Sequence, residues 1–278
     1  MIITFQIDVE KASKEQLEFL AQMTTDCEVL AELAKSPYLG VVLEVASSKY
    51  TSSKTLDALA KDLASCHTFV KNEKVAIFTS ILTNDNCGQD TIRYILTLDE
   101  YRKIEIYDSG KYDYMAQYAL DKVNYIALNT IEYLFENNKV YPEMIIKHFR
   151  DMEFDNNGAT EILEKLKKWL PVENFGILPR FVEFVLIGLA QNTNFRSYQI
   201  EALLQYINEN ILSKQILFSE GRRTEMFYSF AANERTGKNA LNYLATIDDM
   251  KIRDAILKNS NAPAALKKTL RDIGRLKF

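Results

Sequence analysis

Apolar residues recur every three or four positions along most of the chain, the spacing of one face of an α-helix. In SKEQLEFLAQM (13–23), Leu17, Leu20 and Ala21 share such a face, and Ser13 and Gln16 stand at the spacing of a capping box. Asp26 precedes the next such segment as a second capping residue. The pattern predicts helices over residues 13–23, 26–35, 38–47, 52–64, 71–83, 88–98, 111–122, 126–137, 142–152, 158–169, 195–211, 213–219, 223–232, 237–246, 249–258 and 263–273.

The most apolar segment of the chain is NFGILPRFVEFVLIGLAQN, which predicts a central buried helix beginning near Pro179. Its apolar run at 181–190 contains Glu183 and is far shorter than the roughly 20 residues of a membrane-spanning helix. Two segments favour strands: residues 2–9, which alternate apolar and polar positions, and residues 101–108. The predicted fold is therefore all-α, with a short N-terminal strand that could pair with residues 103–107.

A longer-range pattern suggests a repeat. An Asn stands near the end of a helix, a three-residue turn follows, and apolar residues come five and eight positions after the next predicted capping residue. Those capping residues are Thr51, Cys87, Ile126, Tyr141, Thr236 and Ala262, the last with a slip of one residue. The asparagines three positions before four of them are Asn84, Asn138, Asn233 and Asn259. Because Asn tolerates left-handed backbone, we expect each to end a helix in that conformation. Stacked units of this kind form an α-solenoid, although a composition of 47% hydrophobic residues also produces such spacings by coincidence.

Two segments carry a family resemblance. KSPYLGVVLEVASSKYTSSKTLDALAKD (35–62) resembles the leucine-rich-repeat variant family through Ser36-Pro37, Val45-Ala46, Ser48, Thr51-Ser52, Leu56 and Leu59. IRDAILKNSNAPAALKKTL (252–270) looks similar through Ile256, Asn259 and Ala262-Pro263. The resemblance covers about a third of the chain and implies a helical scaffold like those of HEAT and armadillo proteins. Such scaffolds present binding surfaces rather than one particular chemistry.

The repeat signal predicts one α-helical repeat domain over residues 1–278. The alternative is two halves, with N-terminal repeats over 1–150 and C-terminal repeats with a basic face over 171–278. Nine glycines and five prolines are few for a fold with many tight hairpins, which favours helices. The three widely spaced cysteines and the absence of a signal-peptide pattern predict a reducing, cytoplasmic location without membrane association.

The sequence contains no strong catalytic pattern. Neither His67 nor His148 has a second ligand at zinc spacing, so we expect no metal and no cofactor. RTGKNAL resembles a phosphate-binding loop only at Gly237-Lys238, because the upstream glycine and the Ser or Thr of that motif are absent. Asp249-Met250-Lys251 has the form of half a nuclease motif, and the Asp248-Asp249 pair also fits a helix N-terminus. A metal-dependent hydrolase or nuclease is therefore a distant third hypothesis.

Charge is distributed unevenly. Residues 214–278 hold thirteen Lys and Arg against seven Asp and Glu, a net charge of +6, so the total of −4 leaves −10 for residues 1–213. Stacked repeats could align these cations into a stripe that binds nucleic acid or another polyanion, although solvated helix faces explain the same residues. The candidates are Arg222, Arg223, Arg235, Lys238, Arg253, Lys258, Lys267, Lys268 and Arg271.

Tyrosines gather in YDSGKYDYMAQYALDKVNY, where Tyr112, Tyr114, Tyr118 and Tyr125 are candidate anchors of a protein interface. The alternative is that they close the rim of the core with their hydroxyls in water. Repeat architecture without a catalytic pattern makes a non-enzymatic protein-interaction module the leading hypothesis. A nucleic-acid-binding repeat protein using residues 222–271 is the alternative.

Overall fold

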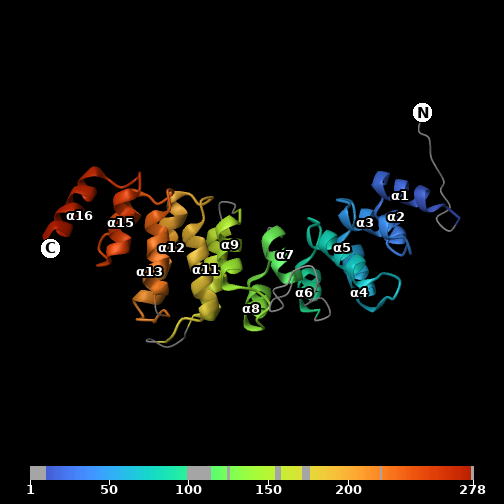
Figure 1. The fold of residues 1–278 in the computed structure, drawn as a ribbon, viewed down its shortest axis with the longest axis horizontal. Coiled ribbons are helices and arrows are strands. Elements are labelled where there is room, and N and C mark those ends of the chain that lie inside the picture. The colour runs from blue at the N-terminus through green and yellow to red at the C-terminus, as the bar shows by residue number, and fades with distance from the viewer. Residues whose placement is uncertain are drawn as a thin grey trace. The chain divides into compact units, whose positions relative to one another are not determined.

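The computed structural model describes residues 11–98, 114–123, 126–153, 158–170, 176–219 and 221–276, and these residues divide into helices and the loops between them (Figure 1). The chain separates into two compact units, Met1–Val140 and Tyr141–Phe278. The all-α prediction is confirmed for the described residues, where the pairing of Ile177 with Leu217 is an isolated β-bridge. The strands predicted at 2–9 and 103–107 lie outside the described residues.

In the first unit, successive odd-numbered helices contact one another, from α1 to α3, α5 and α7, and α4 contacts α6. The early helices begin where the sequence predicts. Ser13 and Gln16 form the capping box of α1, and the Asp26 carboxylate accepts the first-turn amides of α2. The helices of this unit are α1 (Lys14–Met23), α2 (Cys27–Leu33), α3 (Leu39–Ser47), α4 (Ser53–Ser65), α5 (Lys71–Leu82), α6 (Gln89–Thr97), α7 (Tyr114–Lys122) and α8 (Leu128–Glu136).

In the second unit, α9, α11, α13 and α15 contact one another in succession, and α10, α12 and α14 form a second row (Figure 1). The helices are α9 (Pro142–Asp151), α10 (Gly158–Leu166), the 3-10 turn η2 (Lys167–Trp169), α11 (Arg180–Gln191), α12 (Ser197–Ile207), the π-helix η3 (Asn208–Leu212), α13 (Arg222–Ala232), α14 (Lys238–Leu244), α15 (Met250–Lys258) and α16 (Ala264–Leu276).

Helix α11 is the predicted central helix, and every residue from Phe181 to Ala190 is buried. Pro179 stands at its N-cap, where a missing N–H costs no helical hydrogen bond. Gly188 lets α9 approach closely, because a β-carbon added there would lie 2.7 Å from the carbonyl oxygen of Ile146. No helix among the described residues has the length and apolarity needed to cross a membrane.

The asparagines of the predicted pattern follow helix ends in the structure, but most of them do not adopt the left-handed backbone that the sequence predicts. Asn138 does adopt left-handed backbone, with φ of 52°. Asn233 and Asn259 are extended instead, and Asn84 has no positive φ. The prediction was wrong for these three residues, whose backbone amides close the last turn of the helix before them without left-handed backbone. Their side chains bind carbonyl groups of an earlier segment instead.

Four buried asparagines share one role, and we refer to Asn84, Asn192, Asn233 and Asn259 as the buried asparagines. Asn233 is representative: its Nδ2 donates to the carbonyl oxygens of Ala190 and Asn192, both at 2.9 Å, and its Oδ1 accepts from the amide of Arg235. The other three repeat this arrangement at their own positions. Each therefore ties its own loop to the end of an earlier helix in the same unit.

The predicted capping residues are displaced by one position in several helices. Ser52 and Gly237, not Thr51 and Thr236, occupy the N-caps of α4 and α14. The two threonines are fully buried, and each hydroxyl donates to a carbonyl oxygen six residues earlier, 2.6 Å away. They therefore close the turn between two helices and do not cap the second one.

The helix predicted at 213–219 is wrong. After η3 the chain is held extended beside the start of α11, because the amide of Leu178 donates to the carbonyl of Leu217 at 2.9 Å and the amide of Leu217 donates to that of Gly176 at 2.8 Å. The buried carboxylate of Glu183 then accepts the amide of Ser219. These contacts fix the path of the chain into α13.

Candidate functional site

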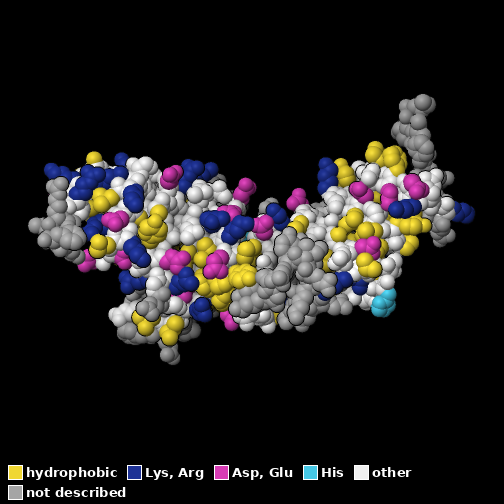
Figure 2. Space-filling model, viewed as in Figure 1, with side chains coloured by type: hydrophobic (Ala, Val, Ile, Leu, Met, Phe, Trp, Pro, Cys, Tyr) yellow, Lys and Arg dark blue, Asp and Glu magenta, His cyan; other side chains and the backbone are white. Residues whose placement is uncertain are grey.

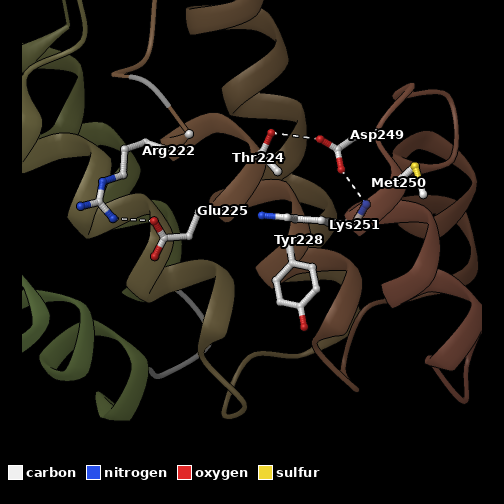
Figure 3. A pocket seen from close by; sticks show the side chains of 8 residues that line it. Arg222, Thr224, Glu225, Tyr228, Asp249, Met250 and Lys251 are labelled. Atoms are coloured by element: carbon white, nitrogen blue, oxygen red, sulfur yellow. Dashed lines mark hydrogen bonds and ion pairs between the residues drawn. The ribbon is translucent and has the colours of Figure 1, made fainter.

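A groove opens between the N-terminal ends of α13 and α15, both within the second unit. Its volume is about 930 Å³, and we call it the α13–α15 groove. It is built from two segments about 25 residues apart in the sequence, as Figure 3 shows. Its lining residues are Gly221, Arg222, Thr224, Glu225, Tyr228, Asp249, Met250 and Lys251.

Asp249 joins the two walls of the groove. It is the N-cap of α15, with Oδ1 accepting the amides of Lys251 at 2.8 Å and Ile252 at 3.2 Å. Its Oδ2 accepts the hydroxyl of Thr224 on α13 at 3.1 Å (Figure 3). The prediction that this carboxylate marks a helix N-terminus is confirmed, and one side chain holds the two helix starts together.

Helix α13 begins differently from α15. Its N-cap is Gly221 in left-handed conformation, with φ of 75° and no side-chain hydrogen bond to the first turn. Arg222 pairs with Glu225 one turn on, and its guanidinium stacks over the Phe184 ring at 4.8 Å. The start of α13 therefore carries the partial positive charge of a helix N-terminus without a capping side chain.

The outer parts of the groove expose apolar surface and one cation. The exposed fractions of Tyr228 and Met250 are 46% and 60%. Lys251 is exposed and forms no ion pair among the described residues, and its side chain extends across the groove toward Glu225 (Figure 3). Tyr228, Met250 and Lys251 were not among the predicted binding residues.

The nine predicted cations do not form one stripe. Arg222 and Arg223 lie at the start of α13, whereas Arg235 and Lys238 lie beyond its end, roughly 16 Å away for a helix of 11 residues. Arg253 is half-buried near the start of α15, at the groove end of that helix. The remaining predicted cations belong to the other end of α15 or to α16: Lys258, Lys267, Lys268 and Arg271.

Arg235 lies where the loops after α11, α13 and α15 meet, which we call the loop edge (residues 192–196, 233–237 and 259–263), and Lys238 follows directly at the start of α14. Asn261 donates to the carbonyl of Thr236, so the last two loops are in contact, and Arg235 donates to the carbonyl of Thr193 at 3.2 Å. The Nε of Arg235 therefore helps to hold two loops together. Figure 2 shows Lys and Arg side chains gathered over α15 and α16.

Arg196 adds a cation that sequence reasoning missed. It is exposed at the end of the loop before α12, the same loop that Arg235 contacts at Thr193. A recurring Asn-x-Asn pattern in the sequence points to the loop that contains Arg196. Asn-x-Asn occurs at residues 84–86, 192–194 and 259–261 with the first Asn buried, and at 208–210 within η3 with the first Asn exposed. The first three occurrences group residues 192–196 with the other asparagine loops.

The predicted tyrosine interface cannot be assembled from the described residues. Tyr118 is half-buried on α7, and Tyr114 begins that helix. Tyr112 and Tyr125 lie outside the described residues, as does the side chain of Tyr114. Trp169 is half-buried and meets the Phe181 ring edge-on at a centroid distance of 5.5 Å.

The thiol of Cys87 is partly buried and lies near the carboxylate of Asp57. Burial raises the pKa of the Cys87 thiol to about 12, with a smaller contribution from the Asp57 carboxylate. Because the thiolate is the nucleophile, Cys87 is protonated and unreactive at neutral pH. Among the described residues, no three His, Cys, Asp or Glu side chains lie close enough to hold a metal ion.

Comparison of the sequence with family models and with curated proteins does not assign this chain to a family. No protein-family model matches the sequence, and no curated protein matches it significantly.

Proposed function

We propose that this chain is a non-enzymatic protein-interaction module of the cytoplasm, built as an α-solenoid of the HEAT or armadillo kind. The rows of helices in each unit and the recurring buried asparagines support the repeat architecture. The observation that carries the function is the α13–α15 groove, where Tyr228 and Met250 expose apolar surface beside charged side chains. Partly exposed aromatic residues in a groove are typical anchors of protein interfaces.

Site-specific photo-crosslinking tests this function. We expect p-benzoylphenylalanine at position 228 of the full chain to form a discrete protein adduct in nuclease-treated lysate of the native cell. Position 198 is the matched control, because Tyr198 is 50% exposed in the same unit but lies at the start of α12, outside the groove. No adduct at 228, or the same adduct at both positions, would overturn the proposal.

The loop edge favours a second candidate function, binding of nucleic acid or another polyanion. The observation is that hydrogen bonds between successive loops bring Arg196, Arg235 and Lys238 to one edge, with Lys258 at the adjoining end of α15. Lysines and arginines spread over neighbouring repeats match an extended anionic chain better than one anionic group.

We expect the Lys238→Glu/Lys258→Glu double variant, which reverses two exposed cations of the loop edge and its adjoining helix end, to bind a dT20 oligonucleotide more weakly than wild type. Loss of two phosphate contacts reduces the slope of log affinity against log salt by about 1.4, at about 0.7 for each contact with a single strand. Mobility shifts at several salt concentrations measure this slope. The control is Lys49→Glu/Lys54→Glu, which changes the same charge at exposed positions of the first unit. No binding by wild type at low salt, or equal slopes for the two variants, would exclude the loop edge as a polyanion site.

A further inference from the structure

We infer that the occupant of the α13–α15 groove is an acidic peptide segment of a partner protein, with carboxylates near Lys251 and an apolar side chain against Tyr228 and Met250. This inference rests on the proposed function and adds the chemistry of the partner. The carboxylates that line the groove are paired within the chain, whereas Lys251 forms no ion pair among the described residues.

The carboxylates of the groove are engaged within the chain. Asp249 accepts three hydrogen bonds, from the Thr224 hydroxyl and the amides of Lys251 and Ile252. Glu225 is paired with Arg222. A basic partner would have to displace these contacts before it gained its own, so the acidic side chains of the groove do not favour a basic occupant.

The uncommitted charge of the groove is positive. Lys251 lines it, is exposed, and has no ion pair among the described residues. Arg223 does not line the groove, and its guanidinium lies 5.8 Å from the ring of Phe227 on the same helix. A carboxylate arriving beside Lys251 gains attraction without breaking an ion pair, which is the electrostatic complementarity of a specific interface.

The same charges favour a peptide over a nucleic acid. A phosphate backbone carries one negative charge per nucleotide, and here it would run past the carboxylates of Glu225 and Asp249. A peptide can place single carboxylates beside Lys251 and neutral residues beside the acids. It can also cover the exposed Tyr228 and Met250 with an apolar side chain. A volume of about 930 Å³ accommodates several residues.

Selection from a random 12-residue peptide library displayed on phage, against the full chain, tests this inference. We expect the selected sequences to be enriched in Asp and Glu next to an aromatic or aliphatic residue. A fluorescein-labelled synthetic copy of the most enriched sequence then gives affinities by anisotropy. We expect Lys251→Glu to weaken its binding about 10-fold or more, because attraction becomes repulsion, and Tyr228→Ala to weaken it by a similar factor.

The matched control is Lys258→Glu, which makes the same charge change on the same helix, two turns further from the groove. We expect it to change the affinity less than about 3-fold, because an exposed charge at that distance is screened by salt. All three positions are exposed, so the variants should keep wild-type circular dichroism spectra and melting temperatures.

The possible failures are distinguishable. Selected peptides that depend on Tyr228 but carry no excess of acidic residues would overturn the acidic-partner inference and leave the proposed docking function intact. If no selected peptide depends on Tyr228 or Lys251, both proposals fail. Displacement of the peptide by dT20 that itself requires Lys251 would assign the groove to nucleic acid instead.

Discussion

Replacing Asn233 with Ala is expected to destabilise the second unit by about 3 kcal/mol, the larger of the two main effects predicted for this chain. The side chain is buried and makes three hydrogen bonds: two from its Nδ2 to the carbonyls of Ala190 and Asn192, and one to its Oδ1 from the amide of Arg235. Alanine leaves these backbone groups without that partner. A loss of this size lowers the melting temperature by roughly 10 °C for a unit of this length.

Urea and thermal unfolding followed by circular dichroism measure the effect. Asn233→Asp separates hydrogen bonding from volume, because it keeps the shape and the acceptor but places a carboxylate against two carbonyl oxygens. We expect it to be at least as destabilising as alanine. The control is Asn242→Ala on an exposed position of α14, which should remain within about 0.5 kcal/mol of wild type. If Asn233→Ala also remained within that range, the buried asparagines would not be important to the stability of the stack.

Replacing Gly188 with Ala is expected to cost about 2 kcal/mol, because the added β-carbon overlaps backbone. It would lie 2.7 Å from the carbonyl oxygen of Ile146 and 2.8 Å from the β-carbon of Phe149, so α9 and α11 must separate. Both helices are well packed here: Phe149 is fully buried, as is nearly all of α11. A side-chain rotation cannot relieve the contact with the Ile146 carbonyl.

Denaturant unfolding measures this loss as well. The control is Gly88→Ala at the N-cap of α6, where the nearest atom to an added β-carbon is the Ser53 hydroxyl, 3.1 Å away. That substitution should cost about 1 kcal/mol or less, because alanine is a poorer N-cap residue than glycine but the Ser53 hydroxyl can rotate aside. Gly188→Ala is therefore expected to be the more destabilising of the two. An unchanged stability of Gly188→Ala would mean that α9 and α11 tolerate a wider separation than the packing indicates.

The helix starts were predicted best from the sequence, because they depend on residues only a few positions apart along the chain. Ser13, Asp26 and Asp249 cap the helices that they were assigned to, because a capping side chain bonds to amides two or three residues away. The buried helix at 181–190 was evident from its composition. The segment 213–219 was mispredicted because its conformation depends on Leu178, Gly176 and Glu183, more than 30 residues earlier.

The sequence alone determined the helical class of the chain, the starts of several helices, and the presence of repeated asparagines, since these follow from local spacing and short-range hydrogen bonds. Only the tertiary structure decided what those asparagines bind, which cations share an edge, and that Thr224 and Asp249 form one groove. The physical reason is that each of these features joins residues that are 25 or more positions apart in the sequence and belong to different helices or loops. Their distance is set by helix packing, which periodicity in one segment does not contain.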